Sequence, residues 1–65
     1  MNIKTTKIAK GYYEFNYKGS KVEIVKNEFP TGETAWYWLI NGEGGNDFFS
    51  TKKNAIISSV YFLTK

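Results

Sequence analysis

The chain has 65 residues, of which 42% are hydrophobic and 18% aromatic, and its net charge is +3. This length allows one domain, residues 1–65, and the apolar content is that of a folded domain and not of a disordered segment. The sequence contains no cysteine, which excludes disulfides and thiolate metal sites and favours a cytoplasmic protein, and it has neither the apolar core of a signal peptide nor a membrane span.

The chain begins with a weakly patterned segment, which a clear hairpin follows. We expect residues 1–10 to form either a frayed lead-in or an edge strand. Residues 11–27, GYYEFNYKGSKVEIVKN, alternate apolar and polar side chains on both sides of a turn at KGS, where Gly19 supplies a positive φ. The residues predicted to face inward are Tyr13, Phe15, Tyr17, Val22 and Ile24.

The stretch AWYWLING, residues 35–42, is predicted to be a third strand that is apolar on both faces. Successive side chains of a strand point to opposite faces, so Trp36, Trp38 and Ile40 share one face. Tyr37 and Leu39 share the other. One of these faces contributes to the core and the other lies outside, and the pattern alone leaves open which is which. The glycine-rich segment NGEGGND ends the strand.

Residues 50–65, STKKNAIISSVYFLTK, are predicted to form a helix with Ser50 or Thr51 as its N-cap. Ile56, Val60 and Leu63 recur at helical spacing, and Ile57 widens this stripe. Many residues between positions 54 and 62 are β-branched or aromatic, so a fourth strand is the alternative. The predicted fold is therefore of the α+β class, a three-stranded antiparallel meander with one C-terminal helix packed on one face (β-β-β-α).

The sequence contains few residues that are suited to catalysis. There is no histidine, and no serine has a plausible base beside it. Glu43 and Asp47, which a glycine-rich loop separates, come nearest to a catalytic carboxylate pair. So small a domain, however, offers no cleft whose burial would raise the pKa of a carboxyl group. We therefore expect no enzymatic activity, no metal ion and no cofactor.

Aromatic residues on the outer sheet face favour a binding function. Glu14 and Glu23 are predicted to lie on that face, and a mixed-charge surface centred on aromatic rings is typical of a protein interface. A protein partner is the first interpretation. Self-association as a homodimer, or burial of both tryptophans under the helix, is the alternative. The predicted protein-binding residues are Tyr12, Trp36, Tyr37 and Trp38.

The second interpretation is a weak nucleic-acid-binding protein. Lysines interleaved with aromatic residues are typical of surfaces that bind single strands, and all nine basic residues of this chain are lysines. Hydroxyl and ammonium groups at the start of the helix are predicted to converge on a phosphate. The plainer interpretation is that these lysines are simply solvated. The residues predicted for an anion site are Ser50, Thr51, Lys52 and Lys53, with Lys21 on the sheet.

Two resemblances bear on function. At the level of architecture, the predicted fold resembles integrase-arm DNA-binding domains, which use arginine for guanine contacts; this chain has no arginine. The run WYW, the glycine loop and FFSTKKNAI resemble small accessory proteins of bacterial viruses, cyanophages especially, over residues 36–65. This second resemblance implies a virus-borne accessory protein that acts in the host cytoplasm by binding a host protein or nucleic acid.

Overall fold

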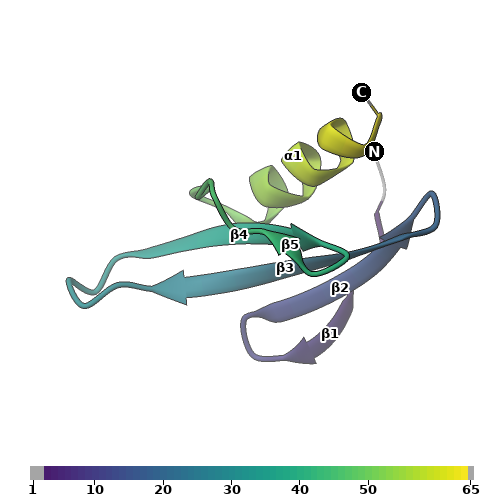
Figure 1. Cartoon of the computed structure of the whole chain (residues 1–65). Coiled ribbons are helices and arrows are strands. Elements are labelled where there is room, and N and C mark those ends of the chain that lie inside the picture. Colours follow the sequence, from purple (N-terminus) through teal and green to yellow (C-terminus); the bar gives the residue numbers. More distant parts are fainter. Residues whose placement is uncertain (1–2, 65) are drawn as a thin grey trace.

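The computed structural model describes residues 3–64, which form an antiparallel five-stranded sheet with one helix across one face (Figure 1). Neighbouring strands in the sheet are also neighbours in sequence, so the sheet is a meander. The predicted α+β class and the C-terminal helix are confirmed, whereas the predicted number of strands is wrong. The elements are β1 (Thr6–Ala9), β2 (Tyr12–Tyr17), β3 (Ser20–Glu28), β4 (Thr34–Ile40), β5 (Glu43–Gly44) and α1 (Lys52–Thr64).

The two additional strands lie at the edges of the sheet, and β1 confirms the edge-strand alternative for residues 1–10. All four residues of β1 are exposed, and the pairing of β1 with β2 is irregular between Lys7 and Ala9. Strand β5 has two residues and lies within the glycine-rich segment that was predicted to be a loop. Such short edge strands are held by backbone hydrogen bonds and bury few side chains, so they leave no period-two pattern in the sequence. Residues 1 and 2 of the predicted lead-in, and Lys65, lie outside the described residues.

The hairpin of β2 and β3 forms as the sequence pattern predicts. Tyr17 pairs with Ser20, and both residues between them have positive φ: 52° at Lys18 and 80° at Gly19. Positive φ at both central residues is the type I′ geometry that matches the twist of a two-residue hairpin. The five residues predicted to face inward lie together: Phe15, Val22 and Ile24 are buried, and Tyr13 and Tyr17 pack against them.

Strand β4 turns its tryptophan face toward the helix. Ile24 pairs with Trp38 and Val22 with Ile40, so both β4 residues share the face of the buried β3 side chains. The Trp38 Nε1–H donates a hydrogen bond to Ser58 Oγ of α1 at 3.1 Å. Tyr37 therefore points to the outer face, together with Leu39.

Helix α1 begins after Thr51, whose Oγ1 accepts a hydrogen bond of 3.0 Å from the backbone N–H of Asn54. The alternative of a fourth strand over this segment is wrong. Val60 is buried as predicted, but Ile57 is 46% exposed and does not widen the buried stripe. Ala55 and Ser59 are fully buried instead. These two small residues, one helical turn apart, allow the helix to lie close to the sheet.

The cap at Thr51 gives the first testable prediction. We expect Thr51→Ala to lower the free energy of unfolding by about 1 kcal/mol, because the Asn54 N–H loses its partner. Ser50→Ala, at the neighbouring exposed position, should change stability by less than about 0.5 kcal/mol. Urea unfolding followed by circular dichroism measures both variants. Equal losses would show that the Thr51 hydroxyl does not cap the helix.

Candidate binding surfaces

The outer face of the sheet is the face opposite α1 (Figure 1). Strand register places Tyr12, Val25 and Tyr37 in one row across β2, β3 and β4. All three side chains are partly buried. Among residues 3–64, the single helix packs on the opposite face, so this row is not covered by α1.

Three rings form a cluster on this face, which we call the outer aromatic cluster: Phe29, Tyr37 and Phe48. The Phe48 ring lies 5.9 Å from Tyr37 and 5.5 Å from Phe29, and both pairs meet edge to face. Such geometry is the favoured one for aromatic pairs. Phe48 is nevertheless 51% exposed. The cluster is therefore an ordered group of rings that remains accessible to solvent.

The loop after β5 brings Phe48 to this position. Gly45 donates its N–H to the Trp38 carbonyl at 3.0 Å, and Phe49 exchanges two backbone hydrogen bonds with Trp36. Phe49 packs against the core while Phe48 lies on the outer face. Phe29 and Phe48 were not among the binding residues predicted from the sequence. The adjacent pair Phe48 and Phe49 was the available signal, since neighbouring residues of an extended segment point to opposite faces.

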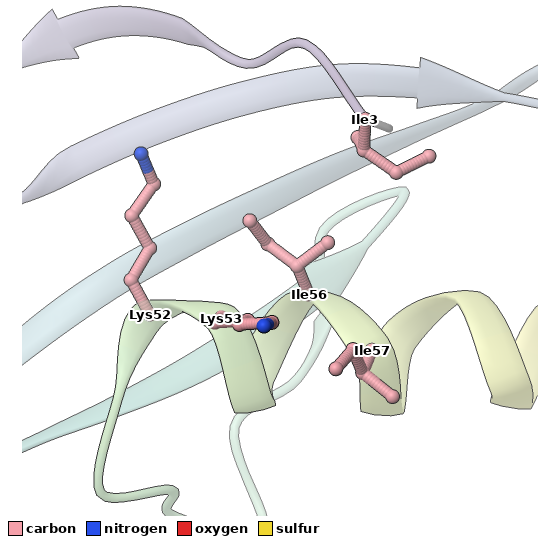
Figure 2. Close-up of a pocket in the computed structure, with 5 residues that line it drawn as sticks. All are labelled: Ile3, Lys52, Lys53, Ile56 and Ile57. Carbon is pink, nitrogen blue, oxygen red and sulfur yellow. The ribbon is translucent and has the colours of Figure 1, made fainter. Parts of the chain in front are cut away.

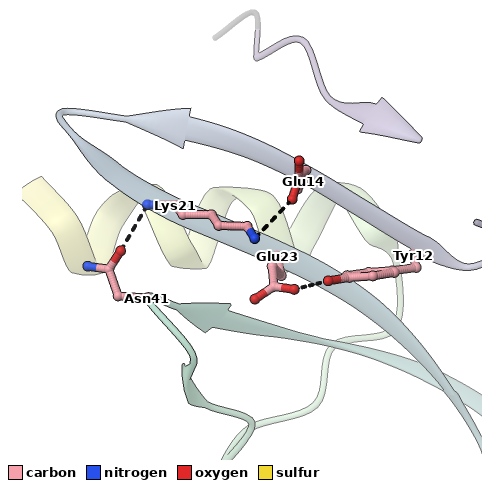
Figure 3. Close-up of polar contacts among 5 residues, drawn as sticks. All are labelled: Tyr12, Glu14, Lys21, Glu23 and Asn41. Atoms are coloured by element: carbon pink, nitrogen blue, oxygen red, sulfur yellow. Dashed lines mark hydrogen bonds and ion pairs between the residues drawn. The ribbon is translucent and has the colours of Figure 1, made fainter. Parts of the chain in front are cut away.

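Polar residues of the outer face are paired with one another (Figure 3). The Tyr12 hydroxyl donates to a carboxylate oxygen of Glu23, and Lys21 Nζ lies 3.5 Å from Glu14 Oε2. The Lys21 backbone N–H donates to Asn41 Oδ1. Lys21 is thus held on the outer sheet face by Glu14 and does not join the predicted anion site at the helix start.

The residues at the helix start do not converge on one point. The Thr51 hydroxyl already accepts the capping bond, and Lys52 Nζ lies 3.6 Å from the centre of the Tyr13 ring. Lys52 and Lys53 point in different directions (Figure 2). Lys52 and Lys53 both line one hollow, together with Ile3, Ile56 and Ile57. The lining of this hollow includes neither Thr51 nor the exposed Ser50, so the structure brings together only the two lysines of the predicted anion site.

The four predicted protein-binding residues are divided between the two faces. Tyr12 and Tyr37 lie on the outer face. Trp36 and Trp38 lie on the helix side, where Trp36 contacts Tyr13 with a centroid distance of 6.1 Å and Trp38 contacts Phe62 at 5.2 Å. The tryptophans are only partly buried. They cannot act on the same partner surface as Tyr12 and Tyr37.

Carboxylates of the described residues are dispersed. Glu43 and Asp47 are both exposed. Residues 3–64 contain no group of three or more acidic side chains that could hold a metal ion. In the same part of the chain, the single helix is too short and insufficiently apolar to cross a membrane.

Comparison with protein-family models, with curated proteins and with solved structures finds no match for this chain, so its functional interpretation depends on the surfaces described above.

Proposed function

We propose that this chain is a non-catalytic binding module that recognises another protein through its outer sheet face. The observation that supports this proposal is the exposed position of Phe48, whose ring packs edge-on against Tyr37 and Phe29. Aromatic side chains held in place before binding lose little conformational entropy on association, and they frequently dominate the energy of an interface. Phe48 would be the anchor of such an interface.

The charges around this cluster favour a protein over a polyanion. Glu14 and Glu23 lie on the same face, where they would repel phosphate groups. Lys21 balances the charge of Glu14, whereas the neutral Tyr12 hydroxyl leaves Glu23 with its negative charge. The partner surface that fits is therefore apolar at its centre and carries no excess of negative charge around it.

Phe48→Ser tests this proposal. We expect the variant to bind the protein partner about tenfold or more weakly, because truncation of an aromatic anchor removes most of its buried contact area. Phe62→Ser is the matched control: its side chain is 55% exposed, against 51% for Phe48, but it lies on α1. Capture from nuclease-treated extract would identify the partner, and titration calorimetry with the purified partner would give both affinities.

Two outcomes would contradict the proposal. One is an unchanged affinity of the Phe48→Ser variant for the purified partner. The other is capture that nuclease treatment abolishes. Self-association that disappears in Phe48→Ser, measured by sedimentation, would instead make a second copy of the chain the partner. That the partner is a protein of the host cytoplasm is also part of the proposal, and the resemblance of residues 36–65 to accessory proteins of bacterial viruses supports it.

A further inference from the structure

Lysines gather around two aromatic rings on the helix side of the sheet. Lys7 pairs with Tyr13 across β1 and β2, and Lys26 pairs with Trp36 across β3 and β4. Paired residues of neighbouring strands point to the same face, so these side chains all lie on the side of α1. We call this region the lysine–aromatic surface. It comprises Lys7, Lys10, Tyr13, Lys26, Trp36 and Lys52.

The turn between β1 and β2 brings Lys10 close to Lys26. The Lys26 N–H donates to the Gly11 carbonyl at 2.8 Å, so this turn lies directly beside β3. At Gly11, a Cβ atom would come within 3.1 Å of the Lys26 Cβ. The absence of a side chain at Gly11 therefore allows the Lys26 stem to lie against the turn.

The two rings are accessible from the same side as the lysines. Tyr13 and Trp36 are inclined at 44° to each other and are partly buried. A hollow of about 280 Å³ is lined by both rings and by Lys10, Lys26 and Glu28. This volume lies just below the range for small-molecule sites, about 300–1,000 Å³. A planar group that enters the hollow would meet aromatic carbon on its walls and ammonium groups at its rim.

The positive charge of this surface is not neutralised internally. Within residues 3–64, the structure contains one ion pair, which joins Lys21 to Glu14 on the outer face. Lys7, Lys10 and Lys26 have no carboxylate partner in that part of the chain, and Lys52 Nζ lies over the Tyr13 ring. Glu28 contributes one negative charge to the lining of the hollow. Several lysines against one acid produce a local field that attracts anions.

We infer that the lysine–aromatic surface binds single-stranded nucleic acid, with a base stacked on Trp36 and backbone phosphates held by the lysines. Base stacking on aromatic rings combined with lysine contacts to phosphate is the general mode of single-strand binding. A base within a duplex is covered on both faces by its neighbours, so it cannot stack on a ring in this hollow. Stacking on a ring and lysine contacts to phosphate are both tolerant of base sequence. This inference is independent of the proposed protein interface, which lies on the opposite sheet face.

Fluorescence anisotropy with labelled oligothymidylate and oligouridylate of about 12 nucleotides, and with a duplex of equal length, tests the inference. We expect both single strands to bind more tightly than the duplex, and affinity to fall steeply between about 50 and 200 mM salt. Comparison of the two single strands shows whether DNA or RNA is preferred. Equal affinity for the duplex, or no binding of either single strand at low salt, would overturn the inference.

Paired lysine variants locate the site. Lys10→Gln combined with Lys26→Gln should lower the slope of log affinity against log salt by about 1.4, since each phosphate contact on a single strand contributes about 0.7. Lys18→Gln combined with Lys21→Gln removes the same charge at the far end of the hairpin, where Lys21 is bound to Glu14. This control should keep the wild-type slope. Equal losses in both double variants would indicate a general charge effect and would refute the site.

Trp36→Leu tests the stacking component. It retains an apolar side chain on β4 but removes the ring face, and we expect affinity for the single strands to fall about tenfold, with little change in the salt slope. Circular dichroism would establish that the variant is folded, and quenching of Trp36 fluorescence by oligonucleotide in Trp38→Phe gives a second readout that needs no change at Trp36. An unquenched Trp36 in saturated complexes would show that no base stacks there.

Discussion

Replacement of Ile24 by alanine is expected to lower the free energy of unfolding by about 2–5 kcal/mol. Ile24 is fully buried on the central strand β3, between the neighbouring strands and beneath α1. Its truncation removes apolar contacts and leaves a cavity that a sheet fixed by hydrogen bonds on both sides cannot close. A domain of this size has a total stability of only about 3–10 kcal/mol, so the variant should lose a large fraction of it.

The same substitution at Ile57 provides the control. Ile57 lies on the exposed side of α1, where it is 46% accessible, and alanine has a higher helix propensity than isoleucine. We expect Ile57→Ala to change stability by less than about 0.5 kcal/mol. Urea unfolding followed by tryptophan fluorescence compares the two variants. A loss below 1 kcal/mol at Ile24 would contradict the position of the core beneath the helix.

Gly44→Ala is expected to lower the free energy of unfolding by about 2 kcal/mol or more. Gly44 has φ 134°, which is accessible to glycine alone, and a Cβ at this position would lie 2.6 Å from the Trp38 carbonyl oxygen. The contacting atom belongs to the backbone of β4, so the clash cannot be relieved by rotation of a side chain. Strand β5 and the loop that carries Phe48 should therefore detach from the edge of β4.

Gly42→Ala separates backbone strain from this clash. Gly42 has φ 85°, but nothing lies within 4 Å of the position of its added Cβ. The expected loss is about 1 kcal/mol, from the left-handed conformation alone. Hydrogen exchange of the Gly45 N–H, which donates to the Trp38 carbonyl, reports whether the loop has detached. Equal stability losses and unchanged exchange in both variants would show that the close approach at Gly44 has no structural role.

The two proposed surfaces can be tested separately because they use opposite faces of one sheet. Phe48→Ser changes the outer aromatic cluster and should leave oligonucleotide affinity unchanged. The Lys10 and Lys26 double variant should leave protein binding unchanged. Gly44→Ala would disturb the outer face preferentially, since the loop it anchors carries Phe48. If either surface variant weakened both protein binding and oligonucleotide binding, a single partner would have to contact both faces across the edge of the sheet.

Local patterns in the sequence determined the central part of the fold. The alternation of residues 13–17 and 22–24 selected the inward face of the hairpin, because a strand period of two is a property of neighbouring residues. Gly19 determined the turn through its positive φ. Thr51 determined the start of the helix, since its partner Asn54 is only three residues away. In each case the interacting groups are close together along the chain.

Tertiary structure decided the rest, including both candidate surfaces. Strand β4 is apolar on both faces, so the position of α1 decided that Trp36 lies on the helix side and that Tyr37 lies outside. Strand pairing brought Lys7 and Lys26 to this face, and helix packing placed Lys52 over the Tyr13 ring, although these lysines are far apart in the sequence. Phe48 reached Phe29 only because a glycine-rich loop returned along the edge of β4. Local periodicity carries no information about such contacts, because their free energy depends on which elements pack together and not on the pattern within either one.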